Sequence, residues 1–362
     1  MRQVARHGDQ RDHLGQSAGE RRLTVSADNA GNGDAPARAD GQAAAQKQRE
    51  IQAEQDRKDE QKQGASANEQ KGAVQAGARR QPDRLPAQHQ QKPGSEAELA
   101  LAPQFMAPDY RGSGKLDGFA AIVTGGDSGI GRAVAVLFAR EGADVTIAYL
   151  DEHEDAAETK RCVEAEGRRC VVVAGDIKQP NFPERIVGAT IEAFGRLDVL
   201  VNNAAFQEHA SSLEDLTDER FDETFRTNIF GYMRMARAAL PHLKHGASII
   251  NTGSVTGLEG SPKLLDYSAT KGAIHAFTKS LAQSLIEKGI RVNAIAPGPV
   301  WTPLNPADSP ADKVAEFGKD TDMKRAAQPE ELSPAYVFLA APACAGYITG
   351  IVLPVTGSVG AF

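Results

Sequence analysis

The sequence predicts an α/β fold, a doubly wound parallel sheet that forms a single domain behind a long disordered N-terminal tail. Three observations predict it. Short apolar runs alternate with segments of helical spacing from about residue 118 onward, as βαβ units do. A glycine-rich turn follows the first run. The first hundred residues contain hardly any aromatic side chains, so they bury too little apolar surface to offset the entropy of ordering.

The tail is expected to span residues 1–100, a connector at 101–117 to pack on the domain, and the domain to span 118–362. Residues 42–63 are good helix formers. Ile51 is the one large aliphatic side chain in that segment. A helix there would have no face to bury, so we expect a solvated, fluctuating segment. A helix that binds a partner is the alternative. Pro82, Pro86 and Pro93 then break any helix.

The strands are predicted at apolar runs without polar alternation, which are typical of strands buried on both faces of a parallel sheet. Helical spacing follows the first run at 132–141 and the second run up to Glu166. Right-handed crossovers then place helices on both faces of the sheet. In chain order, the predicted strands are 119–123, 145–149, 170–174, 199–201, 247–251, 291–295 and 351–353.

The glycine-rich turn at 124–131 has the pattern Gly-x-x-x-Gly-x-Gly. Gly125 lets the chain turn sharply, Gly129 lets the backbone approach a pyrophosphate, and Gly131 permits close packing of the helix that follows. That helix offers free N–H groups and a partial positive charge at its N-terminus. A glycine cluster alone also makes ordinary turns, but its place between a buried strand and a helix predicts a dinucleotide site in a Rossmann-like fold.

A second group of residues carries acid-base chemistry. Tyr267 and Lys271 are four residues apart, so they project from the same face of a helix. A tyrosine with its ordinary pKa of about 10 is too weak an acid-base at neutral pH, and a neighbouring ammonium and a positive nicotinamide lower that pKa. Ser254 can hydrogen-bond a substrate oxygen as charge develops on it. Tyr-x-x-x-Lys alone is an ordinary helix pair, but with Ser254 and the glycine turn it predicts hydride transfer.

These motifs resemble those of the short-chain dehydrogenase/reductase superfamily, from Leu116 to the C-terminus. The resemblance implies a nicotinamide cofactor, an adenine contact at Asp176, and a role for Asn228 in holding a water on the proton relay. After the fourth strand, Ala205 stands where the family has glycine. The implied catalytic residues are Asn228, Ser254, Tyr267 and Lys271. The implied cofactor contacts are Thr124, Gly125, Asp127, Ser128, Gly129, Ile130, Gly131, Tyr149, Asp176, Ile177, Asn203, Ala204, Tyr267, Lys271, Pro297, Gly298, Val300 and Thr302.

The choice between NAD and NADP is made near the end of the second strand, where an acid would repel a 2′-phosphate. Tyr149 is aligned there and carries no such charge. No arginine stands beside it to clamp a phosphate, and Arg132 is the nearest candidate in the glycine turn. The pattern therefore favours NADP slightly over NAD.

Several stretches resemble a narrower bacterial branch that is glucose/ribitol dehydrogenase-like, namely 90–94, 110–116, 301–306 and 328–332. The first of these implies that residues from about 90 belong to the fold. Residues 302–325 stand where the family has a substrate lid, and Trp301 either covers the substrate or packs beneath that lid. Because the lid has no clustered arginine, we expect a sugar, a polyol or a small neutral carbonyl as the substrate.

Composition excludes other classes of function. The net charge of −7 argues against a nucleic-acid partner, and no apolar run approaches the roughly 20 residues that span a bilayer, so we expect a cytoplasmic protein with no membrane partner. The three cysteines lack metal-ligand spacing, and the histidines, among them His209, are expected to be surface or packing residues, so no metal site is predicted. The resemblance implies a homotetramer, although Thr356-Gly357-Ser358 has one glycine fewer than the family's usual ending.

Two alternative functions are open. A 3-oxoacyl-thioester reductase uses the same motifs, but it needs a basic surface for an acidic carrier protein, which the net charge does not favour. A cofactor-sensing or scaffold protein would keep the fold without the chemistry. The intact set of Asn228, Ser254, Tyr267 and Lys271 argues against that second alternative.

Overall fold

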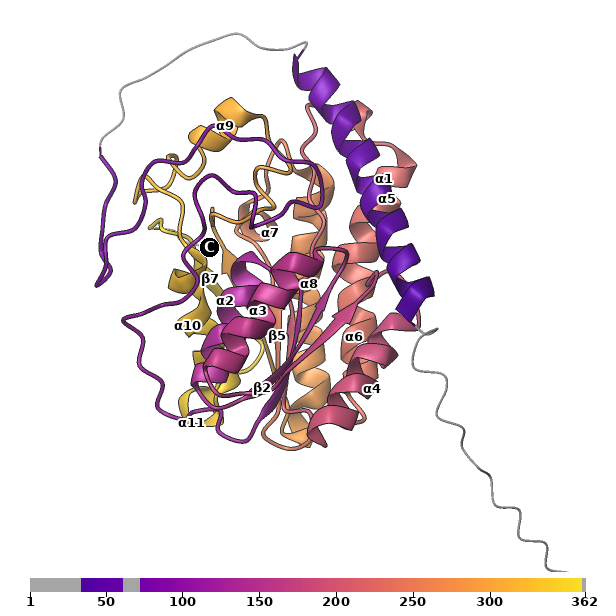
Figure 1. The fold of residues 1–362 in the computed structure, drawn as a ribbon, viewed down its shortest axis with the longest axis vertical. Helices are drawn as coiled ribbons and strands as arrows, with labels where there is room; N and C mark the ends of the chain where they lie inside the picture. Colours follow the sequence, from indigo (N-terminus) through magenta and orange to yellow (C-terminus); the bar gives the residue numbers. More distant parts are fainter. Residues whose placement is uncertain (1–33, 61–71, 360–362) are drawn as a thin grey trace, which may run out of the picture.

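The computed structural model describes residues 34–60 and 72–359 and contains one parallel sheet of seven strands (Figure 1). Their spatial order is β3-β2-β1-β4-β5-β6-β7, so the direction of winding reverses between β1 and β4. The predicted doubly wound fold is confirmed, and each predicted strand is present with ends that differ by at most two residues. The strands are β1 Ala120–Thr124, β2 Asp144–Tyr149, β3 Cys170–Ala174, β4 Val199–Asn202, β5 Ser248–Thr252, β6 Arg291–Pro297 and β7 Val352–Val355.

Helices cover both faces of the sheet (Figure 1). One face carries α2 Gly129–Arg140, α3 His153–Ala165, α10 Pro329–Ala340 and α11 Pro342–Ala345. The other carries α4 Phe182–Phe194, α5 Asp218–Phe225, the π-helical segment η2 Arg226–Phe230, α6 Gly231–Ala239, α8 Leu265–Leu285 and the 3₁₀ turn η3 Ile286–Lys288. Because side chains alternate along a strand, Val123 packs with the first group of helices and Ile122 with the second.

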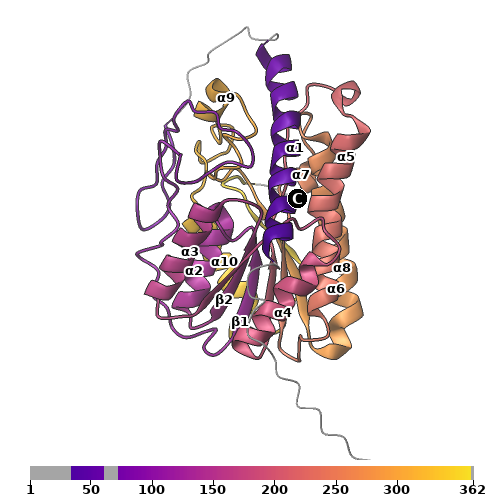
Figure 2. The same ribbon diagram turned by 45° about the vertical axis from the view of Figure 1, so that its right-hand side comes forward.

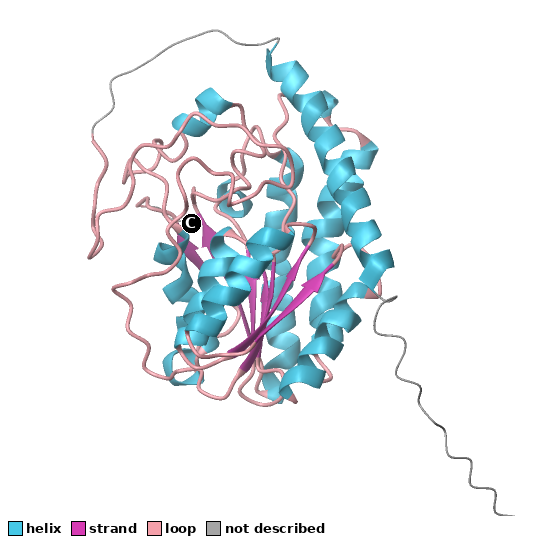
Figure 3. Cartoon of the chain, in the orientation of Figure 1, coloured by secondary structure: helices cyan, strands magenta, loops and turns pink. Residues whose placement is uncertain are grey.

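The connections beyond the carboxyl ends of the strands hold three short helices. They are η1 Leu213–Asp215, α7 Thr256–Glu259 and α9 Ala311–Ala315. Figure 3 shows that loops gather at this end of the sheet. Doubly wound folds bind their ligands at this edge, where the strand order reverses.

The N-terminal arm, which we define as residues 34–60 and 72–117, packs on the domain. Its helix α1 Asp34–Glu60 buries Ala45 and Gln52, which are 0% and 2% exposed. The prediction of a disordered tail is therefore wrong for residues 39–60 and 72–89. From about residue 90 the chain packs on the domain, as the branch resemblance implies, while residues 1–33 and 61–71 lie outside the described part. The prediction failed because the buried face of α1 consists of small residues and glutamines rather than large aliphatic ones. Within the described ranges, no helix is long and apolar enough to cross a membrane.

The rest of the arm runs over the lid and the first helices of the domain. Trp301 is fully buried, packs with Leu99 and Val314, and donates its indole N–H to the Leu101 carbonyl at 2.8 Å. Of the two alternatives for Trp301, packing beneath the lid is the one observed. Lys92 is 2% exposed and donates to the Ala307 carbonyl at 2.7 Å, so the arm and the lid are fixed to each other.

Candidate active site

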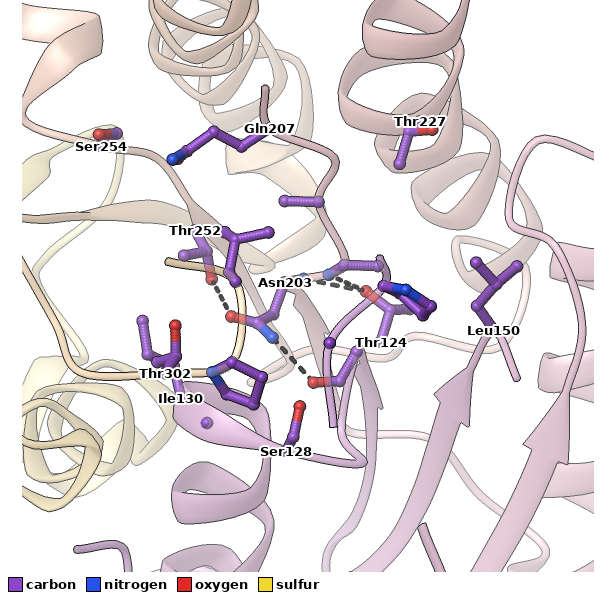
Figure 4. A pocket seen from close by; sticks show the side chains of 18 of the residues that line it. Thr124, Ser128, Ile130, Leu150, Asn203, Gln207, Thr227, Thr252, Ser254 and Thr302 are labelled. Atoms are coloured by element: carbon purple, nitrogen blue, oxygen red, sulfur yellow. Dashed lines mark hydrogen bonds between the residues drawn. The ribbon is translucent and has the colours of Figure 1, made fainter. Parts of the chain in front are cut away.

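A cavity lies at the carboxyl edge of the sheet, between the loops that follow β1 to β6. Figure 4 shows Asn203 near its centre, with Ser254 and Gln207 on one side and Leu150 and Thr227 on the other. All of the predicted catalytic and cofactor residues line this cavity, apart from Gly131 and Asn228. The sequence motifs therefore converge on one site, although they are spread along the chain from Thr124 to Thr302.

The glycine turn leaves room for a close approach of backbone. Gly125 and Gly129 have φ angles of 61° and 51°, a region that favours glycine. A Cβ atom at Gly131 would lie 1.8 Å from the Gly125 carbonyl oxygen, and one at Gly129 would lie 2.8 Å from Cγ2 of Thr302. The turn can thus bring the N-terminus of α2 against a ligand, as a pyrophosphate requires. Gly131 acts within the turn, which explains why it does not line the cavity.

Asn203 and Thr124 join the ends of three strands. The Thr124 hydroxyl accepts from the N–H groups of Asn203 and Ala204, at 2.9 and 3.1 Å. Asn203 Nδ2 donates to the Gly125 carbonyl at 3.0 Å, and its Oδ1 accepts from the Thr252 hydroxyl at 3.2 Å (Figure 4). Asn203 therefore holds the floor of the cavity in shape.

A carboxylate from the arm lies at the N-terminus of α2. Glu96 accepts from the Gly129 N–H and from Arg132 Nη1, both at 2.6 Å. Burial raises the pKa of Glu96 to about 7, against the opposing charge of Arg132. Sequence reasoning missed Glu96, because its partners are distant from it in the sequence and no local pattern marks it.

Arg132 is not a free cation for a 2′-phosphate. Its Nε donates to the Asp127 carbonyl at 2.9 Å, and its Nη2 donates to the Asp155 carbonyl at 3.0 Å. Together with the bond to Glu96, these contacts engage all three nitrogens of a side chain that is 3% exposed. Arg132, the nearest candidate in the glycine turn, is therefore already engaged by groups of the protein.

Two acids lie at the end of the cavity near β2. Asp127 and Glu152 both line it. Burial, together with the charge of Asp127, raises the pKa of Glu152 to about 8. Burial also raises the pKa of Asp127 above its ordinary value. Sequence reasoning considered Tyr149 at this place but missed Glu152, although its position three residues after β2 was a usable signal.

The opposite end of the cavity holds the tyrosine and the lysine, both on α8. Lys271 Nζ donates to the Thr252 carbonyl at 2.9 Å and lies 5.3 Å from the ring centre of Tyr267. Burial lowers the pKa of Lys271 to about 7. Burial also raises the pKa of Tyr267, while a hydrogen bond with Ser254 lowers it. Without a bound nicotinamide, burial is the largest influence on the pKa of Tyr267.

Asn228 lies in the π-helical segment and does not line the cavity. Its Oδ1 accepts from the Phe206 N–H at 2.8 Å. Its Nδ2 donates to the Phe206 carbonyl at 2.9 Å and to the Thr270 hydroxyl at 3.0 Å. The side chain joins the loop after β4 to the turn of α8 that lies between Tyr267 and Lys271.

His209 lies in a cluster of acids that sequence reasoning did not predict. Its Nδ1 is 3.0 Å from Asp308 and 3.2 Å from Glu208, and its Nε2 contacts Asp59 of α1. Burial alone would lower the pKa of His209, but the bonds to Asp308 and Glu208 outweigh it and raise the pKa to about 10. Lys92 Nζ lies 3.0 Å from Glu208. Ligand atoms of Glu208, His209 and Asp308 lie within 4.8 Å of one another, and here they bond to each other.

Comparison with known proteins agrees with this geometry. Residues 125–359 match the model of a family described as enoyl-(acyl carrier protein) reductase. The uncharacterized oxidoreductase YhdF of Bacillus subtilis (strain 168) is 53% identical over 271 residues, which are 75% of this chain and 93% of that protein. The chloroplastic NADPH-dependent aldehyde reductase 1 of Arabidopsis thaliana is 49% identical, over 75% of this chain and 96% of that protein. The glucose and ribitol dehydrogenase of Daucus carota is 47% identical, over 75% and 95%.

Solved structures are similar as well. A short chain dehydrogenase from Burkholderia cenocepacia J2315 in complex with NADP has a TM-score of 0.63 at 34% identity, over 67% of this chain and 98% of that chain. One from Mycobacterium paratuberculosis bound to NAD has a TM-score of 0.62 at 28% identity, over 67% and 98%. The resemblance inferred from the motifs is confirmed: the chain belongs to the short-chain dehydrogenase/reductase family of oxidoreductases.

Proposed function

We propose that this oxidoreductase binds NAD or NADP and transfers a hydride between the nicotinamide and a neutral carbonyl or alcohol, with Tyr267 as the acid-base. The observation that carries the proposal is the placement of Ser254, Tyr267 and Lys271 at one end of a cavity whose middle is the N-terminus of α2. The relatives named as an aldehyde reductase and as a glucose and ribitol dehydrogenase support the same substrate class.

The proton path follows from the positions of three side chains. When bound, the nicotinamide supplies or accepts the hydride and, in its oxidised form, adds a positive charge beside the tyrosine. Tyr267 donates its hydroxyl proton to the substrate oxygen in reduction and removes it in oxidation. Ser254 hydrogen-bonds that oxygen as charge develops on it. Lys271, with a pKa near 7, is able to return a proton at neutral pH.

Asn228 acts as a positioning residue in this account. Its amide oxygen and nitrogen both bond the backbone of Phe206, and the nitrogen also donates to the Thr270 hydroxyl. The Thr270 hydroxyl in turn donates to the Tyr267 carbonyl at 2.7 Å. We therefore assign to its side chain the alignment of α8 with the loop after β4, in place of a direct contact with a relay water.

The substrate end of the cavity favours a neutral ligand. Leu264, Leu304 and Phe317 line it together with the amides of Gln207 and Asn305. Among the described lining residues there is no arginine that could hold a carboxylate or a phosphate. Apolar walls with a few neutral polar groups suit sugars, polyols and small carbonyls.

The experiment is a titration of the purified protein with NADH and NADPH by fluorescence, followed by a turnover screen of polyols, sugars and small carbonyls with the tighter cofactor. Binding and turnover of a neutral substrate are expected. Binding without turnover across the screen would contradict the proposed substrate class, and absence of binding would contradict the cofactor site.

The reduction of an acyl thioester is a second candidate. The description of the matching family, which names the acyl carrier protein, favours it, and the leucines at the substrate end would suit an acyl chain. Adding a 3-oxoacyl thioester and an enoyl thioester to the same screen separates the two proposals.

We also propose that the protein is a cytoplasmic homotetramer. Two separate faces expose large apolar side chains, one with Phe230 and Met233 near α6 and one with Phe338, Tyr347 and Ile351 near β7. Two distinct self-complementary faces are what a closed tetramer with two-fold axes requires. Light scattering coupled to size exclusion should give four times the mass of the chain.

A further inference from the structure

The arm helix α1 lies across one end of the cavity. Figure 2 shows it between the layer of α2 and α3 and the layer of α5 and α6. Gln48 of α1 is itself a lining residue. Gly41 lies so close to the end of β2 that a Cβ atom there would be 2.7 Å from the Leu150 carbonyl oxygen. The helix thus forms part of the cavity wall.

The end under α1 is the one that would take the adenosine of a dinucleotide. Tyr267 and Lys271 stand at the other end, where the hydride must be exchanged, and the N-terminus of α2 lies between the two ends. A dinucleotide crosses the point where the strand order reverses, with its pyrophosphate at that helix. Leu150 and Asp176, at the ends of β2 and β3 where α1 packs, would therefore hold its adenosine.

The face that α1 turns to the domain has a helical spacing and is buried. Three small residues at its N-terminal end allow close contact with backbone, and three glutamines follow. Its members are Gly41, Ala44, Ala45, Gln48, Gln52 and Gln55. The helix is held in place by polar bonds: Lys92 N–H donates to Gln52 Oε1 at 2.7 Å, and Arg49 Nε donates to the Lys92 carbonyl at 2.8 Å.

The neutral amide of Gln48 lies near three charged side chains, those of Glu223, Lys178 and Asp176. Gln48 is 6% exposed, and its Nε2 donates to Glu223 at 3.4 Å, which is a long bond. Lys178 Nζ lies 2.8 Å from a carboxylate oxygen of Glu223 and 3.2 Å from one of Asp176. The lysine therefore forms an ion pair with each of the two acids. Because Glu223 already pairs with Lys178 and its bond to Gln48 is long, the Gln48 amide is available to hydrogen-bond a ligand in the cavity.

We propose that α1 closes the adenosine half of the cofactor site and that Gln48 hydrogen-bonds the adenine ring. A primary amide offers a donor beside an acceptor, which matches the amino group and the ring nitrogen on an edge of adenine. The inference rests on the proposed binding of NAD or NADP in this cavity. It makes Gln48 a binding residue that precedes the glycine turn and the whole of the sheet in the sequence.

The test compares the full-length protein with its Gln48→Ala variant and with Gln46→Ala as the matched control. Gln46 is exposed on the same helix and bonds Glu50 within it. The ligands are the tighter reduced dinucleotide and reduced nicotinamide mononucleotide, which has no adenosine. We expect Gln48→Ala to weaken dinucleotide binding about threefold to tenfold, the worth of one hydrogen bond, and to leave mononucleotide binding unchanged. Gln46→Ala should leave the binding of both ligands unchanged.

A second variant, Ala45→Arg, should displace the whole of α1 from the domain, because Ala45 is fully buried and leaves no room for a longer side chain. It should weaken dinucleotide binding more than Gln48→Ala does, with mononucleotide binding unchanged. Unchanged or tighter dinucleotide binding in both variants would overturn the proposal, as would equal weakening of both ligands. A wild-type protein that binds no dinucleotide would instead refute the cofactor site itself.

Discussion

The domain and the N-terminal arm differ in the kind of side chain that they bury. In the domain, large apolar side chains such as Ile122, Phe138 and Leu200 have no exposed surface. In α1 and the stretch up to Glu96, many of the buried contacts are polar, among them Gln52 with Lys92 and Glu96 with Arg132. Farther along the arm, Leu99 and Leu116 add apolar contacts. The difference teaches that a segment poor in apolar residues can still pack on a fold, provided that its buried polar groups find partners.

The two regions also divide the proposed function. The domain supplies the groups that move a proton and a hydride, whereas the arm encloses the adenosine end of the cavity and ties the lid. Variants in the domain should therefore change turnover or the stability of the whole fold, and variants in the arm should change ligand affinity or local stability.

The largest effect is expected for Tyr267→Phe in the domain. Loss of the acid-base should lower kcat by about a thousandfold, while the affinity for the dinucleotide stays the same because the ring still fills its place. Steady-state kinetics and the fluorescence titration check the two parts. Tyr347→Phe is the control, since Tyr347 does not line the cavity and the variant keeps its apolar ring. Full turnover by Tyr267→Phe would exclude the acid-base role.

Truncating one aliphatic side chain in each region tests how much apolar packing contributes to the stability of the domain and of the arm. Ile122→Ala should lower the free energy of unfolding by about 2–5 kcal/mol, because it leaves a cavity in a packed core. Ile51→Ala, at the one large aliphatic residue of α1, should cost less than about 1 kcal/mol, since Ile51 is only half-buried. Urea unfolding measures both. Equal losses would mean that the arm is also held by apolar contacts.

The cluster around His209 links Asp59 of the arm to Asp308 of the lid. His209→Gln should lower the free energy of unfolding by about 3 kcal/mol. The carboxylates of Asp59, Glu208 and Asp308 would lose the positive imidazolium, and the cation left in the cluster would be Lys92. The folded pKa of His209 is about 10, against an unfolded value of about 6.5. Its contribution is therefore complete below about pH 6.5 and is lost as the pH rises through about 10. A loss in the variant that grows with pH would refute this link.

The smallest effect concerns the choice of cofactor. Glu152, with a pKa raised to about 8, becomes a carboxylate as the pH rises through that value and then repels a 2′-phosphate. The affinity for NADPH relative to NADH should fall by about threefold to tenfold over this range, and Glu152→Gln should abolish the fall. Titrations with both cofactors near pH 7 and pH 9 measure it. Parallel pH profiles in the wild-type protein would show that Glu152 does not face the ribose.

Local patterns in the sequence predicted the sheet and the glycine turn, because buried strands and glycine spacings are encoded within short segments. The family resemblance implied many of the residues that line the cavity. Neither predicted Gln48, Glu96 or the surroundings of His209, because these depend on where the arm packs. Asp59 and Asp308, for example, lie in the arm and in the lid, far apart in the sequence, yet they flank the same imidazole. Asn228 was found by its motif, but the direction of its side chain depends on the π-helical turn.

The most direct test of the proposed function is deuteride transfer. NADH or NADPH carrying deuterium at the transferable position would be incubated with a neutral aldehyde or sugar, and the alcohol product analysed by mass spectrometry. We predict one deuterium on the carbinol carbon with the wild-type protein, and formation of this product about a thousandfold more slowly with Tyr267→Phe. Failure of the wild-type protein to transfer deuterium from either cofactor to any neutral carbonyl would contradict the account.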